Sequence, residues 1–232
     1  MINNRYQFHD KNYVAVDSII FGFNSDNVLM LLLIKRKFEP CKGCYSLMGG
    51  FVRKDEGLDN AACRILDELT GLKSIYLEQL YTYGDLNRDT EARVISVAYY
   101  ALIKMEDYDE ELGQRYDAQW FPIDKLPPLI FDHETMVEKA IRRLRRKTII
   151  QPIGFELLPE KFTMFQLQKL YESIHHQNFD KRNFRKKILS MNVLTMLNEK
   201  DKIGSKRGAA LFKFDKDKYD HLMENGYSMQ FV

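Results

Sequence analysis

The stretch GGFVRKDEGLDNAACRILDELTGL, residues 49–72, most constrains the fold of this chain. It opens on two adjacent glycines, continues through a charged loop, and then repeats apolar residues at helical spacing as far as Gly71. The apolar positions are Leu58, Ala61, Ala62, Ile65, Leu66 and Leu69. Apolar residues at intervals of three and four predict a helix with one buried face, and glycine commonly follows the end of a helix. The stretch therefore predicts a tight turn, a loop and a helix, in that order.

Strand patterns surround this helix on both sides. Apolar or alternating runs predict strands at residues 14–23, 28–34, 45–51, 77–83 and 94–103, with a short one at 120–123. The turn-forming NSDN between the first two runs predicts a hairpin. After two prolines, an amphipathic helix at residues 133–146 closes the unit and leads out of it, with its arginines left to solvent or phosphate. This order of elements indicates a layered α/β domain over residues 1–150.

The last third of the chain has a different pattern. Residues 152–159 are proline-containing and predict a linker. Thr163 and Asp180 are candidate N-caps of two helices that end near residues 176 and 191. Strand patterns at residues 193–197 and 209–214 follow, joined by the charged turn NEKDKIGSKRG. Helices followed by a basic hairpin predict a winged helix-turn-helix domain over residues 151–232.

Charge divides the chain in the same way. The net charge is +2, but residues 1–138 hold 15 lysines and arginines against 23 carboxylates, a balance of −8. Residues 139–232 hold 20 against 10, a balance of +10. Such an asymmetry favours a domain that faces nucleic acid, although a solvated charged helix would also produce it.

Composition argues against a membrane protein, a secreted disulfide-bonded protein and a zinc protein. The longest apolar run, residues 28–34, is far shorter than the roughly 20 residues that span a bilayer, and MINNRYQFHD is no signal segment. We therefore expect a cytoplasmic protein without membrane contact. Three cysteines argue against a disulfide framework. The lone CKGC at residues 41–44 lacks the further ligands of a zinc site, so an ordinary turn is favoured over a metal or redox site, and no metal or cofactor is expected.

The opening stretch resembles the Nudix box, whose pattern is G-x5-E-x7-R-E-U-x-E-E-x-G-U with U aliphatic. The matching residues are Gly50, Glu56, Arg64, Leu66, Glu68, Gly71 and Leu72. The resemblance implies a Nudix-like α/β/α sandwich. Metal binding needs carboxylates three and four residues apart on one helix face, here Ile65, Glu68 and Leu69. Since Ile65 and Leu69 replace glutamates, we expect no catalytic residues and no enzyme. The alternative is a hydrolase of nucleoside diphosphate derivatives with a weak metal site at Glu56 and Glu68.

Across almost its whole length the chain resembles the Nudix-related transcriptional regulators. That resemblance implies a degenerate Nudix domain that senses a small molecule, often ADP-ribose, and a winged helix that binds operator DNA as a dimer. We expect a homodimeric repressor of sugar-utilisation genes on a palindromic operator. The two aliphatic replacements suit an uncharged sugar, so L-arabinose is the predicted effector. An ADP-ribose-responsive regulator of NAD metabolism is the alternative.

Candidate contacts follow from these assignments. For the effector they are Gly49, Gly50 and Phe51 in the box, and Asp85, Arg88 and Asp89 in the segment GDLNRD, which could equally be turn or salt-bridge residues. For DNA they are Lys181, Arg182, Asn183, Arg185 and Lys186, with Lys206 and Arg207 at the wing tip. On a helical wheel the cations lie broadly opposite Phe184, Ile188 and Met191. Such a helix can bury one face and offer the other to a major groove, although a solvated amphipathic helix has the same pattern.

Overall fold

The computed structural model describes residues 9–71, 75–105, 108, 117–150, 154–202 and 208–224. Its first part is a seven-stranded mixed sheet in the order β3-β2-β1-β6-β5, with β4 paired to β1 and β7 paired to β2. The strands are β1 (Tyr13–Phe23), β2 (Leu29–Lys35), β3 (Tyr45–Ser46), β4 (Met48–Phe51), β5 (Glu78–Tyr83), β6 (Val94–Leu102) and β7 (Ala118–Pro122). β1 runs parallel to β6 and antiparallel to β2 and β4.

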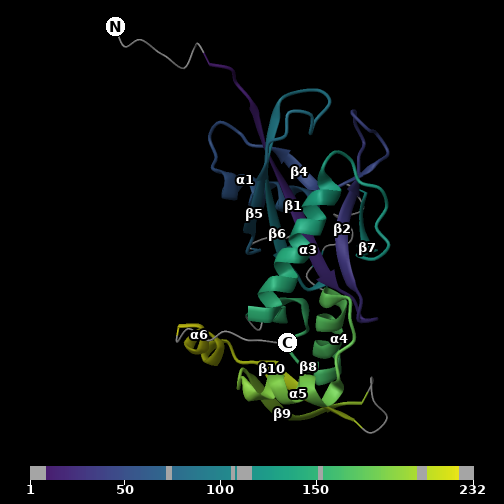
Figure 1. Cartoon of the computed structure of the whole chain (residues 1–232), viewed down its shortest axis with the longest axis vertical. Helices are drawn as coiled ribbons and strands as arrows, with labels where there is room; N and C mark the ends of the chain where they lie inside the picture. The colour runs from purple at the N-terminus through teal and green to yellow at the C-terminus, as the bar shows by residue number, and fades with distance from the viewer. Residues whose placement is uncertain are drawn as a thin grey trace.

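Helices cover both faces of this sheet. On β1, Val16 and Ile20 face the side of α1 (Leu58–Thr70), whereas Ile19 and Phe21 face the side of α3 (His133–Ile150). The alternation follows from the two-residue period of a strand, and it extends to β6. Figure 1 shows α3 lying across the near face of the sheet. The expected α/β/α sandwich is therefore confirmed.

The box helix begins and ends where its glycines predict, but the tight turn expected at Gly49 and Gly50 was wrong, because both residues lie in β4 and pair with β1. α1 follows Gly57 and is stopped by Gly71, whose φ of 73° is the left-handed conformation that favours glycine. The strand predicted at residues 45–51 is instead divided at Leu47. Its first half, β3, pairs with β2, and its second half, β4, pairs with β1, so the chain changes neighbours between them.

The second part is a winged helix. Its elements are β8 (Phe162–Thr163), α4 (Met164–His175), α5 (Lys181–Ser190), β9 (Leu194–Asp201), β10 (Ala209–Phe214) and α6 (Lys216–Glu224), and the strands form a sheet in the order β8-β10-β9. Thr163 caps α4 through a capping box, and Asp180 caps α5 through the N–H of Asn183, as their positions predict. The sequence patterns did not identify β8 and α6.

The segment predicted as a linker is packed into the core. Residues 155–157 form a short 3-10 helix, η3, in which Phe155 stacks on Phe214 of β10 with ring centroids 4.1 Å apart. Leu157 and Leu158 are 2% and 0% exposed. Their hydrophobic cluster also contains residues of β1, β2 and α4, so the two parts of the chain share buried surface. Residues 154–159 of the predicted linker are therefore packed against both parts of the chain.

Among the helices that the structure describes, none combines the length and the apolar content needed to cross a bilayer.

Candidate effector pocket and DNA-reading surface

A cavity of about 610 Å³ opens above the box, at the edge of the sheet where α3 begins. Five of the six predicted effector residues line it: Gly49, Gly50, Phe51, Arg88 and Asp89. They come from β4 and from the loop between β5 and β6, so the parallel pairing of β1 with β6 brings the two segments to one place. A cavity of this size lies within the range of small-molecule and cofactor sites.

Asp85 lies outside the residues that line this cavity. Its carboxylate accepts the N–H of Asn87 at 3.0 Å, and its carbonyl oxygen accepts a hydrogen bond from Arg93 at 2.8 Å. Asp85 is thus a turn residue, the alternative reading of the GDLNRD segment, and its assignment as a cavity-lining effector residue is corrected. Asp89 lines the cavity while its carboxylate accepts the N–H of Glu91 at 2.9 Å.

Arg88 is held in a buried group of charged side chains. It is 7% exposed and makes a two-pronged ion pair with Asp132, with Nε and Nη2 at 3.0 and 2.8 Å from the carboxylate oxygens. The same guanidinium lies 3.5 Å from Asp17 of β1, which also accepts a hydrogen bond from the Ser96 hydroxyl of β6. Because Asp132 directly precedes α3, this group links the cavity floor to the start of that helix.

His133, the first residue of α3, completes the floor. Its Nδ1 accepts the backbone N–H of Leu47 at 3.1 Å, so the ring proton is on Nε2, which lies 3.6 Å from Asp17 Oδ1. Burial lowers the pKa of His133, and the neutral ring is the form at neutral pH. Asp17 also explains the first box glycine, because a Cβ at Gly49 would lie 2.1 Å from its Oδ1.

Aromatic rings and one arginine form the wall that sequence patterns missed. The Arg36 guanidinium lies 4.3 Å from the Phe38 ring centroid and 5.7 Å from that of Phe131. Across the cavity Tyr13 and Phe51 approach to 5.5 Å. Phe38 and Phe51 are 62% and 56% exposed. Exposed aromatic residues at loop and strand ends carry no periodic signal, so only their gathering around one cavity identifies them as a candidate ligand surface.

The box positions that would hold a metal are filled differently. Ile65 is 4% exposed and packs under Gly50, where a Cβ would lie 2.9 Å from Ile65 Cδ1. Leu69 packs into the apolar clusters of the same helix face. Glu68 is exposed and forms ion pairs with Arg53 and Arg64 at 3.3 and 3.2 Å. Within the described ranges, no three metal-ligating side chains are grouped as a metal site would require.

The Glu56 carboxylate is likewise engaged by arginine residues. Its carboxylate accepts hydrogen bonds from Arg64 at 2.8 and 2.6 Å and from the backbone N–H of Arg53 at 2.9 Å. The hydrogen bond from Arg64, followed by that from Arg53, lowers the pKa of Glu56 to about 2. Arg64 therefore ties the box loop to α1.

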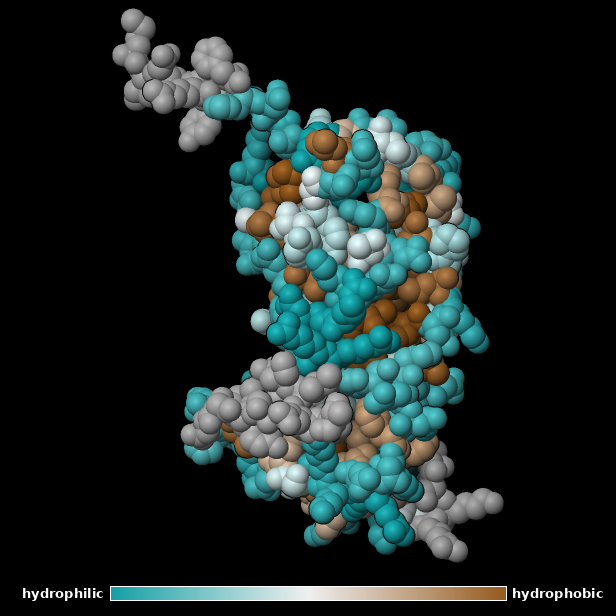
Figure 2. Space-filling view, in the orientation of Figure 1, coloured by the Kyte–Doolittle hydropathy of each residue, from teal (hydrophilic) through white to brown (hydrophobic). Residues whose placement is uncertain are grey.

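α5 presents the predicted DNA-reading residues to solvent. Phe184 and Ile188 are buried against the domain core. The exposed face carries Lys181, Arg182, Asn183, Arg185 and Lys186. Figure 2 shows hydrophilic surface at the lower end of the molecule, where α5 and β9 lie in Figure 1. Lys206 and Arg207 lie outside the described residues.

The arginines of α3 are engaged within the protein. Arg143 forms an ion pair with Glu78 of β5 at 3.2 Å. Arg145 donates from Nε to the carbonyl oxygen of Ile174 in α4 at 2.7 Å, and Thr148 Oγ1 lies 2.8 Å from His175 Nε2. These contacts join α3 to the helix-turn-helix, so the expectation that its arginines all stay solvated or meet phosphate was wrong for Arg143 and Arg145.

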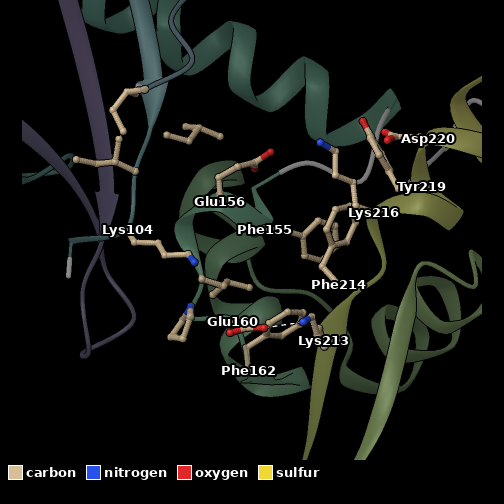
Figure 3. A pocket seen from close by; sticks show the side chains of 15 residues that line it. Lys104, Phe155, Glu156, Glu160, Phe162, Lys213, Phe214, Lys216, Tyr219 and Asp220 are labelled. Carbon is tan, nitrogen blue, oxygen red and sulfur yellow. Dashed lines mark hydrogen bonds and ion pairs between the residues drawn. The ribbon is translucent and has the colours of Figure 1, made fainter. Parts of the chain in front are cut away.

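A second cavity, of about 500 Å³, lies between the two domains (Figure 3). Phe155 and Phe214 pack side by side on its wall, and Lys104 reaches in from the end of β6. An ion pair between Glu160 and Lys213, 2.6 Å apart, borders it. The contact between the domains therefore includes a hollow as well as a packed core.

A Nudix sandwich joined to a winged helix with a cationic exposed helix defines a class of two-domain, DNA-binding regulators. Family models agree with this architecture. Residues 11–147 match the NUDIX domain, and residues 154–214 match the NrtR DNA-binding winged helix domain. The chain belongs to the NrtR-type transcriptional regulators. Both matched ranges lie inside the predicted domains, and the predicted fold class is confirmed.

Individual relatives have the same two domains. The chain is 34% identical over 211 residues to the ADPR responsive transcriptional repressor NtrR of Acinetobacter baylyi, covering 89% of this chain and 84% of that protein. Shewanella oneidensis NrtR complexed with a 27mer DNA superposes with a TM-score of 0.80 at 28% identity, covering 93% of this chain and 97% of that one.

The Nudix part has its own solved counterpart. The NUDIX domain of Shewanella oneidensis NrtR complexed with ADP ribose has a TM-score of 0.52 at 29% identity, covering 61% of this chain and 94% of that one. These comparisons name ADP-ribose and DNA, and they do not support the arabinose-responsive branch that the aliphatic box residues suggested.

Proposed function

We propose that this chain is a transcriptional repressor whose operator affinity is controlled by ADP-ribose, or a ligand of the same chemical class, bound in the Nudix cavity. The observation that carries the proposal is the 610 Å³ cavity lined by Arg36, by Gly49 and Gly50 of β4, and by exposed aromatic rings. The named ligands of the two relatives support it. This proposal replaces L-arabinose as the effector.

The chemistry of the cavity suits a nucleotide sugar better than a free pentose. Exposed rings such as Phe38 and Phe51 can stack on a nucleobase, for which a pentose has no equivalent. The planar guanidinium of Arg36 matches a phosphate group. A free sugar would leave most of the cavity unfilled, and its few hydroxyl groups make no use of the aromatic walls.

We propose that the ligand is bound without being hydrolysed. Hydrolysis of a diphosphate requires a metal to neutralise the developing charge. Ile65 is buried under Gly50 and has no oxygen to offer, and Glu68 is paired with Arg53 and Arg64, so the described box positions lack the ligand set of a metal site. An effector that survives its binding site can act as a reversible signal.

For the DNA-reading face we propose α5. Arg182 and Arg185 suit guanine edges, Asn183 suits adenine, and Lys181 and Lys186 suit phosphate. A single winged helix covers a short half-site, so we propose a homodimer on a palindromic operator with half-sites about 10 base pairs apart, or a multiple of that. ADP-ribose would favour one arrangement of sensor and reader and so change operator affinity.

A thermal-shift screen without added metal tests the effector. ADP-ribose should raise the melting temperature and L-arabinose should not, because a ligand that binds only the folded state stabilises it. Phe38→Ala should weaken ADP-ribose binding about tenfold in calorimetry, the loss expected from one base-stacking ring. Leu86→Ala is the matched control, since Leu86 is 74% exposed and lies outside the cavity.

Two results would contradict these proposals. A higher melting temperature with L-arabinose and an unchanged one with ADP-ribose would favour the arabinose-responsive regulators instead. Steady hydrolysis of ADP-ribose with Mg²⁺, abolished by Glu68→Gln, would make the chain a hydrolase.

A further inference from the structure

Two of the three cysteines lie in the segment that follows Pro40, a residue of the effector-cavity lining. Cys41 and Cys44 are exposed and flank a turn closed by the Cys44 N–H on the Cys41 carbonyl oxygen at 3.1 Å. Gly43 has a φ of 88°, as the third position of a type II turn requires. Such a turn holds its outer Cα atoms within about 7 Å, and most disulfides span about 4.4 to 6.8 Å. The backbone spacing of the two cysteines is therefore compatible with a disulfide.

This turn is attached to the cavity through Arg36. The Arg36 backbone N–H donates to the Cys44 carbonyl oxygen at 3.0 Å, and its own carbonyl oxygen accepts the Gly43 N–H at 2.9 Å. The Arg36 Nε donates to the carbonyl oxygen of Pro40, the residue before Cys41, at 2.9 Å. Backbone and guanidinium of the cavity arginine are thus both anchored next to a cysteine.

Neither an ordinary turn nor a metal accounts for the pair. A type II turn requires the glycine but has no need of a thiol at either outer position. A structural zinc ion needs four ligands, and within the described residues no third cysteine, histidine or carboxylate joins these two in a metal-binding group. Two exposed thiols at the outer positions of one turn are suited to disulfide chemistry.

We propose that Cys41 and Cys44 form a dithiol modification site that is oxidised by small-molecule disulfides and thereby controls the effector cavity. One thiolate attacks the disulfide and releases one thiol. The second cysteine then attacks the mixed disulfide and releases the other, so that the protein dithiol is oxidised as the reagent is reduced to two thiols. The effect on effector affinity rests on the proposed ADP-ribose response, whereas the formation of the bond does not.

The new bond constrains the backbone at Cys41, directly after the Pro40 carbonyl that accepts the Arg36 Nε hydrogen bond, and we expect this constraint to break that hydrogen bond. Released from this anchor, the guanidinium no longer has a fixed orientation toward the cavity. The affinity for ADP-ribose should then fall roughly fivefold, which corresponds to the loss of one net hydrogen bond.

The bond itself is tested by intact-mass spectrometry of a Cys63→Ser chain treated with oxidised glutathione. Cys63 is the remaining exposed cysteine, and its removal leaves only the pair. The expected product has lost two hydrogen atoms, carries no glutathione, and is restored by a dithiol reductant. A chain that stays reduced, or that accumulates a glutathione adduct, would overturn the proposal.

Calorimetry then tests the consequence. Oxidised Cys63→Ser should bind ADP-ribose about fivefold more weakly than the reduced chain. Cys41→Ser with Cys44→Ser should bind equally under both treatments. Equal affinities of the oxidised and reduced pair would refute control of the cavity. If the reduced chain fails to bind ADP-ribose at all, the proposed function is wrong, and the mass measurement still decides whether the disulfide forms.

Discussion

Arg145→Met tests whether effector binding reaches the DNA-reading domain through the contact between α3 and α4. Arg145 donates to the carbonyl oxygen of Ile174 at 2.7 Å, one residue before α4 ends, and Thr148 contacts His175 beside it. The other end of α3 begins at the buried group of Asp132, Arg88 and Asp17 that forms the cavity floor. One rigid helix therefore touches both functional regions.

The expected size of the effect on operator affinity follows from the strength of the hydrogen bond that Arg145→Met removes. A hydrogen bond from a charged group contributes about 1.5 to 3 kcal/mol, and the half-buried position of Arg145 reduces this to about 1 to 1.5 kcal/mol. Methionine keeps most of the apolar stem and removes only the guanidinium. Coupling between two sites is typically about 1 to 3 kcal/mol. Losing the contact should therefore reduce the effect of ADP-ribose on operator affinity roughly five- to tenfold.

Fluorescence anisotropy of labelled operator, with and without ADP-ribose at one salt concentration, measures this effect. Calorimetry should show ADP-ribose affinity within about twofold of the unaltered chain, because Arg145 is remote from the cavity. Arg146→Met is the matched control, since Arg146 is exposed and makes no ion pair or hydrogen bond within the described part of the chain. If ADP-ribose changes operator affinity as strongly in Arg145→Met as in the unaltered chain, the coupling does not pass through the contact between α3 and α4. An equal reduction of this change in Arg145→Met and Arg146→Met would also refute that coupling.

Three further predictions concern the reader and the buried floor. Arg182→Ala with Arg185→Ala should abolish operator binding in the anisotropy assay and leave the ADP-ribose thermal shift intact; retained affinity would place the reading face elsewhere, and loss of both signals would indicate misfolding. Asp180→Ala removes the cap of α5 and should lower the free energy of unfolding by about 1 kcal/mol in urea denaturation, where an unchanged midpoint would contradict the capping role. Because burial lowers the pKa of His133, the unfolded chain binds the proton first, and the free energy of unfolding should fall as the pH drops below about 6.5. His133→Asn, whose amide oxygen can still accept from Leu47, should flatten that dependence, and equal slopes would argue against this origin.

Local patterns in the sequence were sufficient for most elements. The α1 helix, the caps at Thr163 and Asp180 and the first hairpin depend on residues a few positions apart, and each forms where its pattern predicts. The aliphatic residues at two box positions were also readable directly. The sugar effector predicted from these two residues is not supported, because the loss of metal ligands does not determine the volume or the walls of the cavity.

Tertiary structure alone decided which residues meet. Arg88 pairs with Asp132 across 44 positions, and Phe131 meets Arg36 at one wall although the two residues lie far apart in the chain. Asp85 is excluded from the cavity by a turn only three residues from Arg88. Helical and strand periods report which face of an element is buried, because they depend on local backbone geometry. The cavity depends on the register in which β1 pairs with β6 and β4, and that register is set by packing between distant segments.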